Sequence, residues 1–178
     1  MAEPELPAAA RAFAPGTFAR RTALVTGGGT GLGLAISRGL AALGAHVVIA
    51  SRSSEHHTAL LEEAQARGWS AEAHVLDVRE ATDVERLARA LGERLGALDL
   101  LVNNAAGNFV CPAERLSARA WRAVLGIVLD GTFHCSRYFG APMLEAGRGA
   151  ILNVVATYAW TGMPGAVSYT HLTLPTKA

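Results

Sequence analysis

The sequence predicts an α/β fold built on a doubly wound parallel sheet, and three observations support this prediction. Short apolar runs rich in Val and Ile recur along the chain, and segments with the apolar period of an amphipathic helix alternate with them. A glycine-rich turn follows the first run. Strands that are apolar on both faces must be covered on both sides, which favours a parallel sheet between two layers of helices. Right-handed crossovers then give the doubly wound order.

The expected elements follow in chain order. Short, continuous apolar runs are typical of buried strands, and the expected strands are Thr22–Thr26, His46–Ser51, Ala73–Leu76, Asp99–Asn103 and Ala150–Val155. The segments between them carry apolar residues at helical spacing. These residues are Leu34, Gly39, Leu40 and Leu43; then Leu60, Leu61 and Ala64; then Val84, Leu87, Ala88, Leu91 and Leu95; and then Trp121, Val124, Leu125 and Val128. Gly96 is expected to end the third helix.

The composition indicates one domain and argues against several classes of protein. The chain has 178 residues, of which 51% are hydrophobic and 17% are charged, as is typical of a compact domain with buried strands. A formal net charge of +1 gives no electrostatic reason to expect nucleic acid or an acidic membrane surface as a partner. No apolar run approaches the ~18 residues that a membrane span needs. We therefore expect a cytoplasmic protein.

The N-terminus, the cysteines and the histidines indicate no further site. Residues 1–18 are expected to form a loose leader, in which Glu3 and Glu5 interrupt the apolar stretch that a secretory signal would need. Cys111 and Cys135 lie far apart and outside any CxxC pattern, so two buried structural thiols are expected. The six histidines are scattered without metal-ligand spacing, and we expect no metal.

The glycine-rich turn TGGGTGLG lies between the first expected strand and the first expected helix. Glycines let the backbone approach a pyrophosphate closely, and a helix N-terminus supplies amide donors and a favourable dipole. The turn therefore predicts a dinucleotide site, and the alternative is an ordinary strand–helix loop. The residues of the turn that are expected to bind the cofactor are Thr26, Gly27, Gly29, Thr30, Gly31, Leu32 and Gly33.

Three motifs together resemble the short-chain dehydrogenase/reductase superfamily over residues 20–165. They are TGGGTGLG, LDV and NNAAG, which begin at Thr26, Leu76 and Asn103. The resemblance implies that Asp77 accepts a hydrogen bond from the adenine amino group and that Val78 contacts the adenine. It also implies that Asn104 and Ala105 line the wall of the cofactor site.

The residues after the second expected strand bear on the choice of cofactor. A 2′-hydroxyl is usually held there by an acidic residue, whereas a 2′-phosphate requires a cation. The chain has Ser51 and Arg52 at this point and no carboxylate before Glu55. A guanidinium can bind a phosphate through two hydrogen bonds, so Arg52 favours NADP, as NADPH, over NAD. The alternative is that Arg52 is a solvated loop charge.

The residues after NNAAG resemble the 2,4-dienoyl-CoA reductase branch of the superfamily. The inserted Ala, the following GNF and the later CPAERLS carry this resemblance. It implies that Asn108 hydrogen-bonds the thioester carbonyl, that Phe109 lies along the acyl chain and that Ser117 belongs to the substrate site. The alternative is that Asn108 caps a turn and Phe109 belongs to the core. Val128 occupies the position of a common superfamily Asn, which weakens the interpretation as a generic ketone reductase.

The catalytic acid is expected just after the fifth strand. The dienoyl-CoA reductase branch has its Tyr there, in a stretch similar to TYAWTG, and the match in this chain is Tyr158. The usual superfamily Ser is missing, because position 156 is Ala. The Lys of the branch would fall at position 173, which is Thr.

The last residues depart from the family pattern. Tyr169 stands where the common superfamily Tyr falls, but Lys177 does not have the i+4 relation to it that a helical neighbour needs. Pro175 would break the helix expected there. We therefore expect residues 168–178 to be a non-family tail and residues 19–167 to be a partial reductase domain. The fifth strand would then be left as an apolar edge.

These observations combine into one hypothesis. A Rossmann-type reductase, incomplete at its C-terminus, reduces a 2,4-dienoyl-CoA with NADPH, with Asn108 polarising the thioester carbonyl and Tyr158 donating the proton. Its partner is an acyl-CoA substrate, and the resemblance implies a homo-oligomer. The enzymatic alternative is a carbonyl reductase or alcohol dehydrogenase of the same superfamily. The other alternative is an inactive nucleotide-binding remnant, because the Lys that would lower the pKa of the Tyr is missing.

Overall fold

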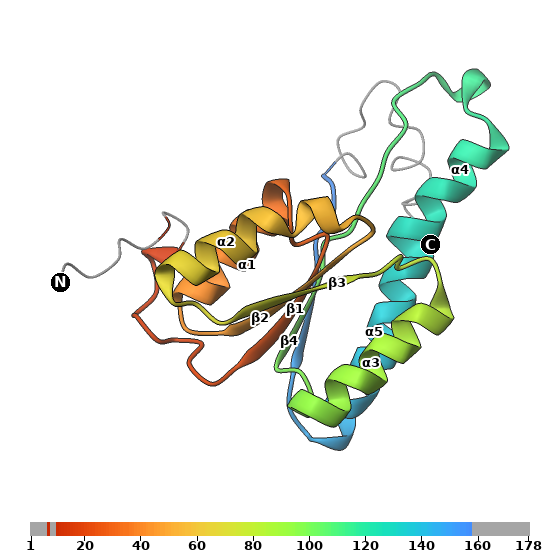
Figure 1. Ribbon diagram of the computed structural model, residues 1–178. Coiled ribbons are helices and arrows are strands. Elements are labelled where there is room, and N and C mark those ends of the chain that lie inside the picture. The colour runs from red at the N-terminus through yellow and green to blue at the C-terminus, as the bar shows by residue number, and fades with distance from the viewer. Residues whose placement is uncertain (1–6, 8–9, 158–178) are drawn as a thin grey trace.

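The computed structural model describes residue 7 and residues 10–157. Its sheet consists of the parallel strands β1 (Thr22–Thr26), β2 (His46–Ser51), β3 (Ala71–Val75), β4 (Leu100–Asn103) and β5 (Ala150–Asn153). Their order in the sheet is β3-β2-β1-β4-β5, which confirms the predicted doubly wound α/β fold (Figure 1). The order reverses between β1 and β4, and ligands bind beyond the carboxyl ends of the strands at such a point.

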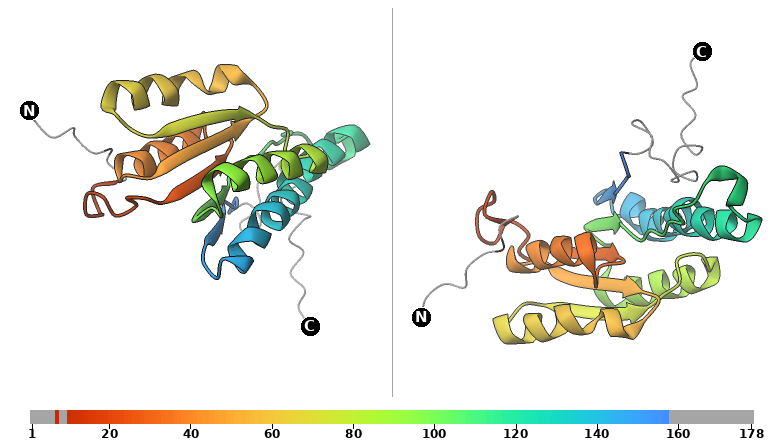
Figure 2. Two further views of the ribbon diagram at one scale, coloured as in Figure 1. Left: turned by 60° about the horizontal axis from the view of Figure 1, so that its bottom comes forward. Right: turned by 90° about the horizontal axis from the view of Figure 1, so that it is seen from above.

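Helices cover both faces of the sheet, as two further views show (Figure 2). Helices α1 (Gly31–Ala42) and α2 (Thr58–Arg67) lie on one face, and α3 (Ala81–Leu95) and α5 (Gly131–Glu145) lie on the other. Helix α4 (Ala118–Leu125) continues into α5 through the π-helical turn η4 (Gly126–Asp130). The short 3₁₀ turns η2 (Ser54–His56) and η3 (Ala113–Arg115) precede α2 and α4.

Neighbouring residues of the central strands enter opposite halves of the core, because side chains alternate across a strand. Leu24, Val48 and Leu101 pack with α3 and α5. Val25 and Ile49 pack with α1 and α2. This burial on both faces explains why the central strands are continuous apolar runs in the sequence.

Some element boundaries differ from the prediction. β3 begins at Ala71, which pairs with β2, and ends at Val75, so the predicted Leu76 lies just beyond the strand. Leu76 is nevertheless buried in the core on the α3 and α5 side. The helical segment predicted up to Val128 extends through η4 and α5, where Phe139 and Met143 fill the same half of the core.

The two cysteines have different environments. Cys135 on α5 is fully buried, and desolvation raises the pKa of its thiol to about 12. Cys111 is only half-buried, in the segment between β4 and α4. The expectation of two buried thiols therefore holds for Cys135 alone.

β5 is the edge strand beside β4, and all of its residues are exposed. Ile151 and Leu152 have exposed fractions of 42% and 51%. The apolar run that the sequence predicts here is therefore covered less than the runs that form β1, β2 and β4.

Candidate active site

A cavity of about 330 Å³ lies beyond the carboxyl ends of β1, β2, β3 and β4. It brings together residues that are far apart in the sequence, and most of the predicted cofactor-binding residues line it. Those that do are Gly27, Thr30, Gly31, Leu32, Gly33, Arg52, Asp77, Val78, Asn104 and Ala105.

Close backbone contacts require glycine at position 29, in the loop after β1, and at position 33, in the first turn of α1. A Cβ atom at Gly33 would lie 2.2 Å from the carbonyl oxygen of Gly27, and one at Gly29 would lie 1.8 Å from that of His56. Gly29 does not line the cavity. It lets the η2 turn pack directly against the loop, so it supports the cavity wall from behind.

The N-terminus of α1 is suited to an anion. The helix begins at Gly31, and its N-cap Thr30 makes no side-chain capping hydrogen bond among the described residues. The first turn contains no acidic residue, and its residues line the cavity. Backbone N–H groups of a first turn lack partners within the helix, and the helix dipole favours negative charge beside them. The residues present therefore fit a phosphate or pyrophosphate group.

Thr26 lies behind the cavity rather than in its wall. Its hydroxyl oxygen accepts hydrogen bonds from the backbone N–H groups of Asn104 and Ala105, both at 3.0 Å. The Asn104 amide nitrogen Nδ2 in turn donates to the Thr26 carbonyl oxygen at 2.9 Å. These bonds fix the NNAAG segment against the end of β1. Thr26 thus shapes the site through two neighbours that do line it.

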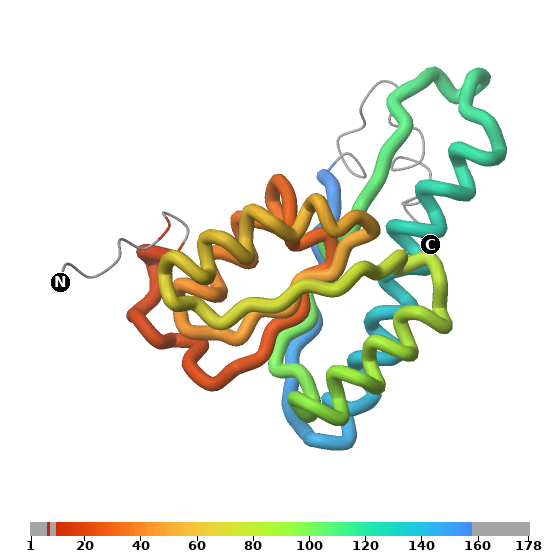
Figure 3. Tube along the Cα trace, viewed as in Figure 1, coloured from red at the N-terminus to blue at the C-terminus, as the bar shows by residue number. Residues whose placement is uncertain are grey.

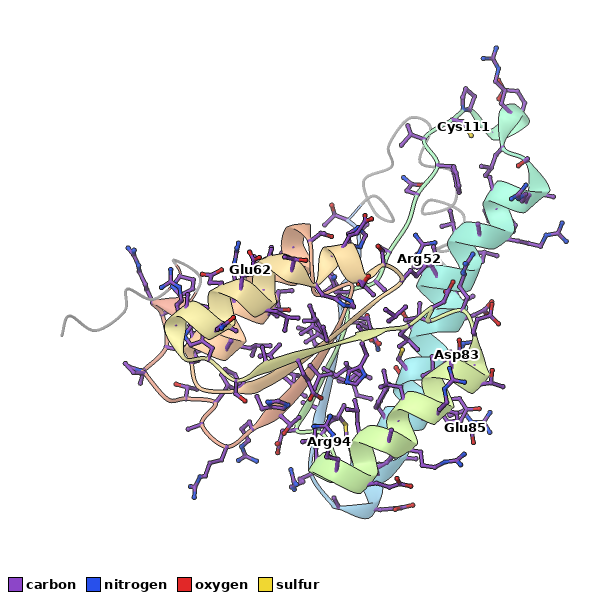
Figure 4. All side chains as sticks on the ribbon, in the orientation of Figure 1. Arg52, Glu62, Asp83, Glu85, Arg94 and Cys111 are labelled. Carbon is purple, nitrogen blue, oxygen red and sulfur yellow. The ribbon has the colours of Figure 1, made fainter. Side chains whose placement is uncertain are left out.

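The loop after β2 places a cation at the cavity. Arg52 lines the cavity with an exposed side chain (Figure 4), and it forms no ion pair with another described residue. The loop is held by buried Ser51 and His57, whose Oγ and Nε2 atoms lie 2.8 Å apart. The Ser51 hydroxyl also donates to the Ser53 carbonyl at 3.1 Å. Burial lowers the pKa of His57, and His56 and His74 act in the same direction.

Asp77 and Val78 line the cavity where the chain leaves β3. Asp77 forms an ion pair with Arg79. Hydrogen bonding by Arg79 holds the pKa of Asp77 below its ordinary value, so this side chain is a carboxylate that can only accept hydrogen bonds.

The predicted substrate residues do not line this cavity. Asn108 and Phe109 lie in the segment between β4 and α4, which runs away from the sheet (Figure 3). Phe109 is 50% exposed, which excludes the alternative that it belongs to the core. Ser117 is the N-cap of α4, where its Oγ accepts a hydrogen bond of 3.1 Å from the N–H of the third residue after it. Tyr158 and the predicted tail, residues 168–178, lie outside the described residues, and their roles stay predictions.

Several further residues line the cavity without having been predicted from the sequence, namely Ala50, Ser51, His56, Leu76, Ala106 and Ile127. Ser51 is the last residue of β2 and His56 the last of η2, and their proximity to Arg52 in the sequence is the one signal that could have found them. Ile127 reaches the cavity from η4, and no local sequence signal predicts this. A Cβ atom at Gly107 would lie 3.1 Å from Ile127 Cδ1, so η4 also contacts the segment that leads to Asn108.

The described part of the chain offers neither a metal cluster nor a membrane span. No group of three or more His, Cys, Asp or Glu residues among the described residues could hold a metal ion. No helix in residues 10–157 is both long enough and apolar enough to cross a membrane.

Comparisons with known proteins agree with the fold. A family model described as short chain dehydrogenase matches residues 21–171. The Bacillus subtilis (strain 168) protein named "Probable 2,4-dienoyl-CoA reductase" is 38% identical over 149 residues, which are 83% of this chain and 59% of that protein. D-threitol dehydrogenase of Mycolicibacterium smegmatis is 35% identical over 149 residues, which are 84% of this chain and 57% of that protein.

A solved structure is also similar to this chain in fold and sequence. The crystal structure of a gluconate 5-dehydrogenase from Burkholderia cenocepacia, in complex with NADP and tartrate, has a TM-score of 0.79 and 33% sequence identity. The match covers 86% of this chain and 60% of that chain. This chain therefore spans less than two thirds of the length of each of these proteins.

Proposed function

The chain belongs to the short-chain dehydrogenase family, and from this premise we propose that it is an NADPH-dependent reductase of 2,4-dienoyl-CoA thioesters that acts in fatty-acid breakdown. One observation carries the substrate class. The GNF sequence that resembles the dienoyl-CoA reductase branch places Asn108 and Phe109 on an exposed segment, two and three residues beyond Ala106 in the cavity wall. The 38% identity to the Bacillus subtilis protein supports the same substrate class.

The cavity fits the proposed cofactor. The glycine loop leaves no room for a Cβ atom at Gly33, and the first turn of α1 offers amide donors for a pyrophosphate. Arg52 would bind the 2′-phosphate, because it is a cation in the cavity wall without an ion-pair partner among the described residues. Asp77 would accept a hydrogen bond from the adenine amino group. When bound, NADPH supplies the hydride for the reduction.

The proposed chemistry assigns two tasks to the chain. The Asn108 amide would donate to the thioester oxygen, where negative charge develops, and such a donor is worth about 10²–10³-fold in rate. The Tyr158 hydroxyl would deliver a proton to the carbon that gains negative charge, and general acid help contributes roughly 10²–10⁴-fold.

The 35% identity to D-threitol dehydrogenase supports a second candidate, an alcohol dehydrogenase or carbonyl reductase of the same family. Val128, within η4, stands where that chemistry commonly has an Asn, which favours the first candidate. A third candidate, cofactor binding without turnover, follows from Thr173 at the expected position of the Lys.

The three candidates separate in one set of assays. NADPH oxidation is measured with a 2,4-dienoyl-CoA and with a simple ketone, and NADPH affinity is measured alone. The assays use the chain extended with the remaining sequence of the Bacillus subtilis relative and with Lys at 173, because the chain spans only 59% of that protein. In this extended chain we expect turnover with the dienoyl-CoA and a loss of about 10²–10³-fold in Asn108→Ala at unchanged NADPH affinity. Tyr158→Phe should remove most of the turnover, whereas Glu62→Ala, an exposed position on α2, should change nothing.

Each other result points to one of the alternatives. Turnover of ketones without turnover of the dienoyl-CoA would favour the second candidate, and NADPH binding without any turnover would favour the third. Near-normal turnover in Asn108→Ala would reject the proposed role of that amide.

A further inference from the structure

Arg79 holds the carboxylate of Asp77 from outside the cavity. Arg79 Nε lies 2.9 Å from Asp77 Oδ1 and 3.0 Å from Oδ2, and Arg79 Nη2 also hydrogen-bonds Oδ2. The backbone N–H of Arg79 donates to Oδ1 at 3.1 Å. Asp77 lines the cavity and Arg79 does not. The guanidinium therefore orients a carboxylate that faces the cofactor site.

The Asp77 carboxylate keeps capacity for one more donor. Three N–H groups of Arg79 make these four contacts, namely the backbone N–H, Nη2–H and a single Nε–H that is shared between the two carboxylate oxygens. An ionised carboxylate accepts about four hydrogen bonds. One acceptor position therefore remains for a donor that enters from the cavity, and the hydrogen bonds from Arg79 help to keep Asp77 ionised by lowering its pKa.

The turn that carries both residues is packed against η4 and α5. The Cγ and Cδ atoms of Arg79 would lie 3.5 and 3.4 Å from a Cβ atom added at Gly126. A Cβ atom at Gly131 would lie 2.6 Å from Val78 Cγ2, and His134 Nδ1 lies 3.0 Å from the Val78 carbonyl oxygen. These contacts restrict the movement of the Arg79 stem and of the backbone beside Asp77.

We propose that Arg79 is a positioning residue for recognition of the base of the dinucleotide. It fixes the Asp77 carboxylate so that the remaining acceptor position faces an exocyclic amino group, and a base with an oxygen at that place is rejected. This inference rests on the proposed function, in which Asp77 accepts a hydrogen bond from the adenine amino group.

The test compares NADPH with its deamino form, in which hypoxanthine replaces adenine and an oxygen replaces the amino group. Dissociation constants are measured by fluorescence titration of the full chain without acyl-CoA. The wild-type chain should bind NADPH roughly tenfold or more tightly than the deamino form, which is what a hydrogen bond to a charged group contributes. Arg79→Met keeps an apolar stem beside Gly126 but loses the guanidinium. It should reduce the preference to roughly two- to threefold, mainly by weakening NADPH binding.

Three further variants make the test specific. Arg79→Lys keeps the charge without the planar fork and should give an intermediate preference. Arg86→Met removes a guanidinium that pairs with Asp83 on α3 at 2.8 Å, away from the cavity wall, and should leave the preference unchanged. Asp77→Ala should abolish the preference. Circular dichroism confirms that each variant is folded.

Several results would overturn the inference. If Arg79→Met weakens both cofactors equally, the role of Arg79 is merely structural, and if it tightens NADPH binding, Arg79 competes with the base. If Arg79→Met keeps the wild-type preference for NADPH over the deamino form and still binds NADPH tightly, the inference is overturned but the proposed function is not. A wild-type chain that binds neither cofactor overturns the proposed function and this inference with it.

Discussion

At the scale of single residues, Arg52 and His57 occupy the same loop after β2 in opposite environments. The Arg52 side chain is exposed at the cavity, where a cation is well hydrated and free to meet an anion. The His57 side chain is buried, where a charge is costly. The loop thus presents a guanidinium to a ligand while a neutral imidazole holds its backbone in place.

Arg52→Ala should weaken the binding of NADPH without changing the binding of NADH. The dissociation constant of NADPH should rise roughly tenfold, because a charge-assisted hydrogen bond to the 2′-phosphate is lost. The dissociation constant of NADH should stay unchanged, and Arg89→Ala on α3 serves as the matched control. Calorimetric titration with both cofactors measures this. Equal losses for NADH and NADPH would contradict the role of Arg52.

His57 should make the fold sensitive to mild acid. Its pKa is lowered in the folded chain from an ordinary value of 6.5, mainly by desolvation. The unfolded chain therefore binds the proton more readily, and the free energy of unfolding should fall as the pH drops through about 6.5 toward the folded pKa. His57→Gln, which keeps an amide donor for Ser51, should flatten this dependence. Urea unfolding between pH 7.5 and 5.5 tests the prediction, and an equally steep dependence in the variant would refute it.

At the scale of elements, the start of α1 is set by backbone packing rather than by helix propensity. Gly33 lies in the first turn against the Gly27 carbonyl, whereas Gly39 lies further along the same helix with nothing within 4 Å of an added Cβ atom. Close backbone packing therefore requires glycine at position 33 but not at position 39.

The two glycines give a matched pair of substitutions. Gly33→Ala should lower the free energy of unfolding by about 1–3 kcal/mol and weaken NADPH binding, because the Gly27 backbone must move. Gly39→Ala should stabilise the fold by up to about 1 kcal/mol through helix propensity and leave NADPH binding intact. Thermal unfolding and titration of both variants provide the measurement. A neutral Gly33→Ala would show that the loop is not tightly constrained.

At the scale of the whole molecule, the central strands of the sheet are better covered than the edge strand β5. β1, β2 and β4 are buried between helices, whereas β5 exposes Ile151 and Leu152, and Leu144 on the adjacent α5 is 84% exposed. The curated relatives are longer, since the chain spans 59% of the Bacillus subtilis protein. Exposed apolar strand edges promote association between chains.

Extending the chain tests the importance of this edge. A chimera in which Ser168–Ala178 is replaced by the remaining sequence of the Bacillus subtilis relative, with Lys at 173, should bind less of a hydrophobic dye and unfold at a higher temperature. It should also turn over NADPH with a dienoyl-CoA. Thr173→Lys alone should change none of these, because Pro175 and the β5 edge remain. If the unextended chain is already monomeric, dye-free and active, this prediction is wrong.

The sequence by itself determined the fold class and much of the lining of the candidate cofactor cavity. Strands buried on both faces leave continuous apolar runs, and backbone segments that pack closely leave glycines, so both are visible in a single chain. The turn after β1 and the LDV and NNAAG motifs predicted most of the residues that line the cavity, because each motif lies at the carboxyl end of a parallel strand.

Only the tertiary structure decided which of these residues line the cavity and which support it. Thr26 and Gly29 belong to the predicted motif but lie behind the wall, since their neighbours in space are Asn104 and His56. Ile127 enters the cavity from η4, and Arg79, although exposed, pairs with Asp77. Such contacts depend on how distant segments pack against one another, and apolar periodicity and local motifs do not predict that packing.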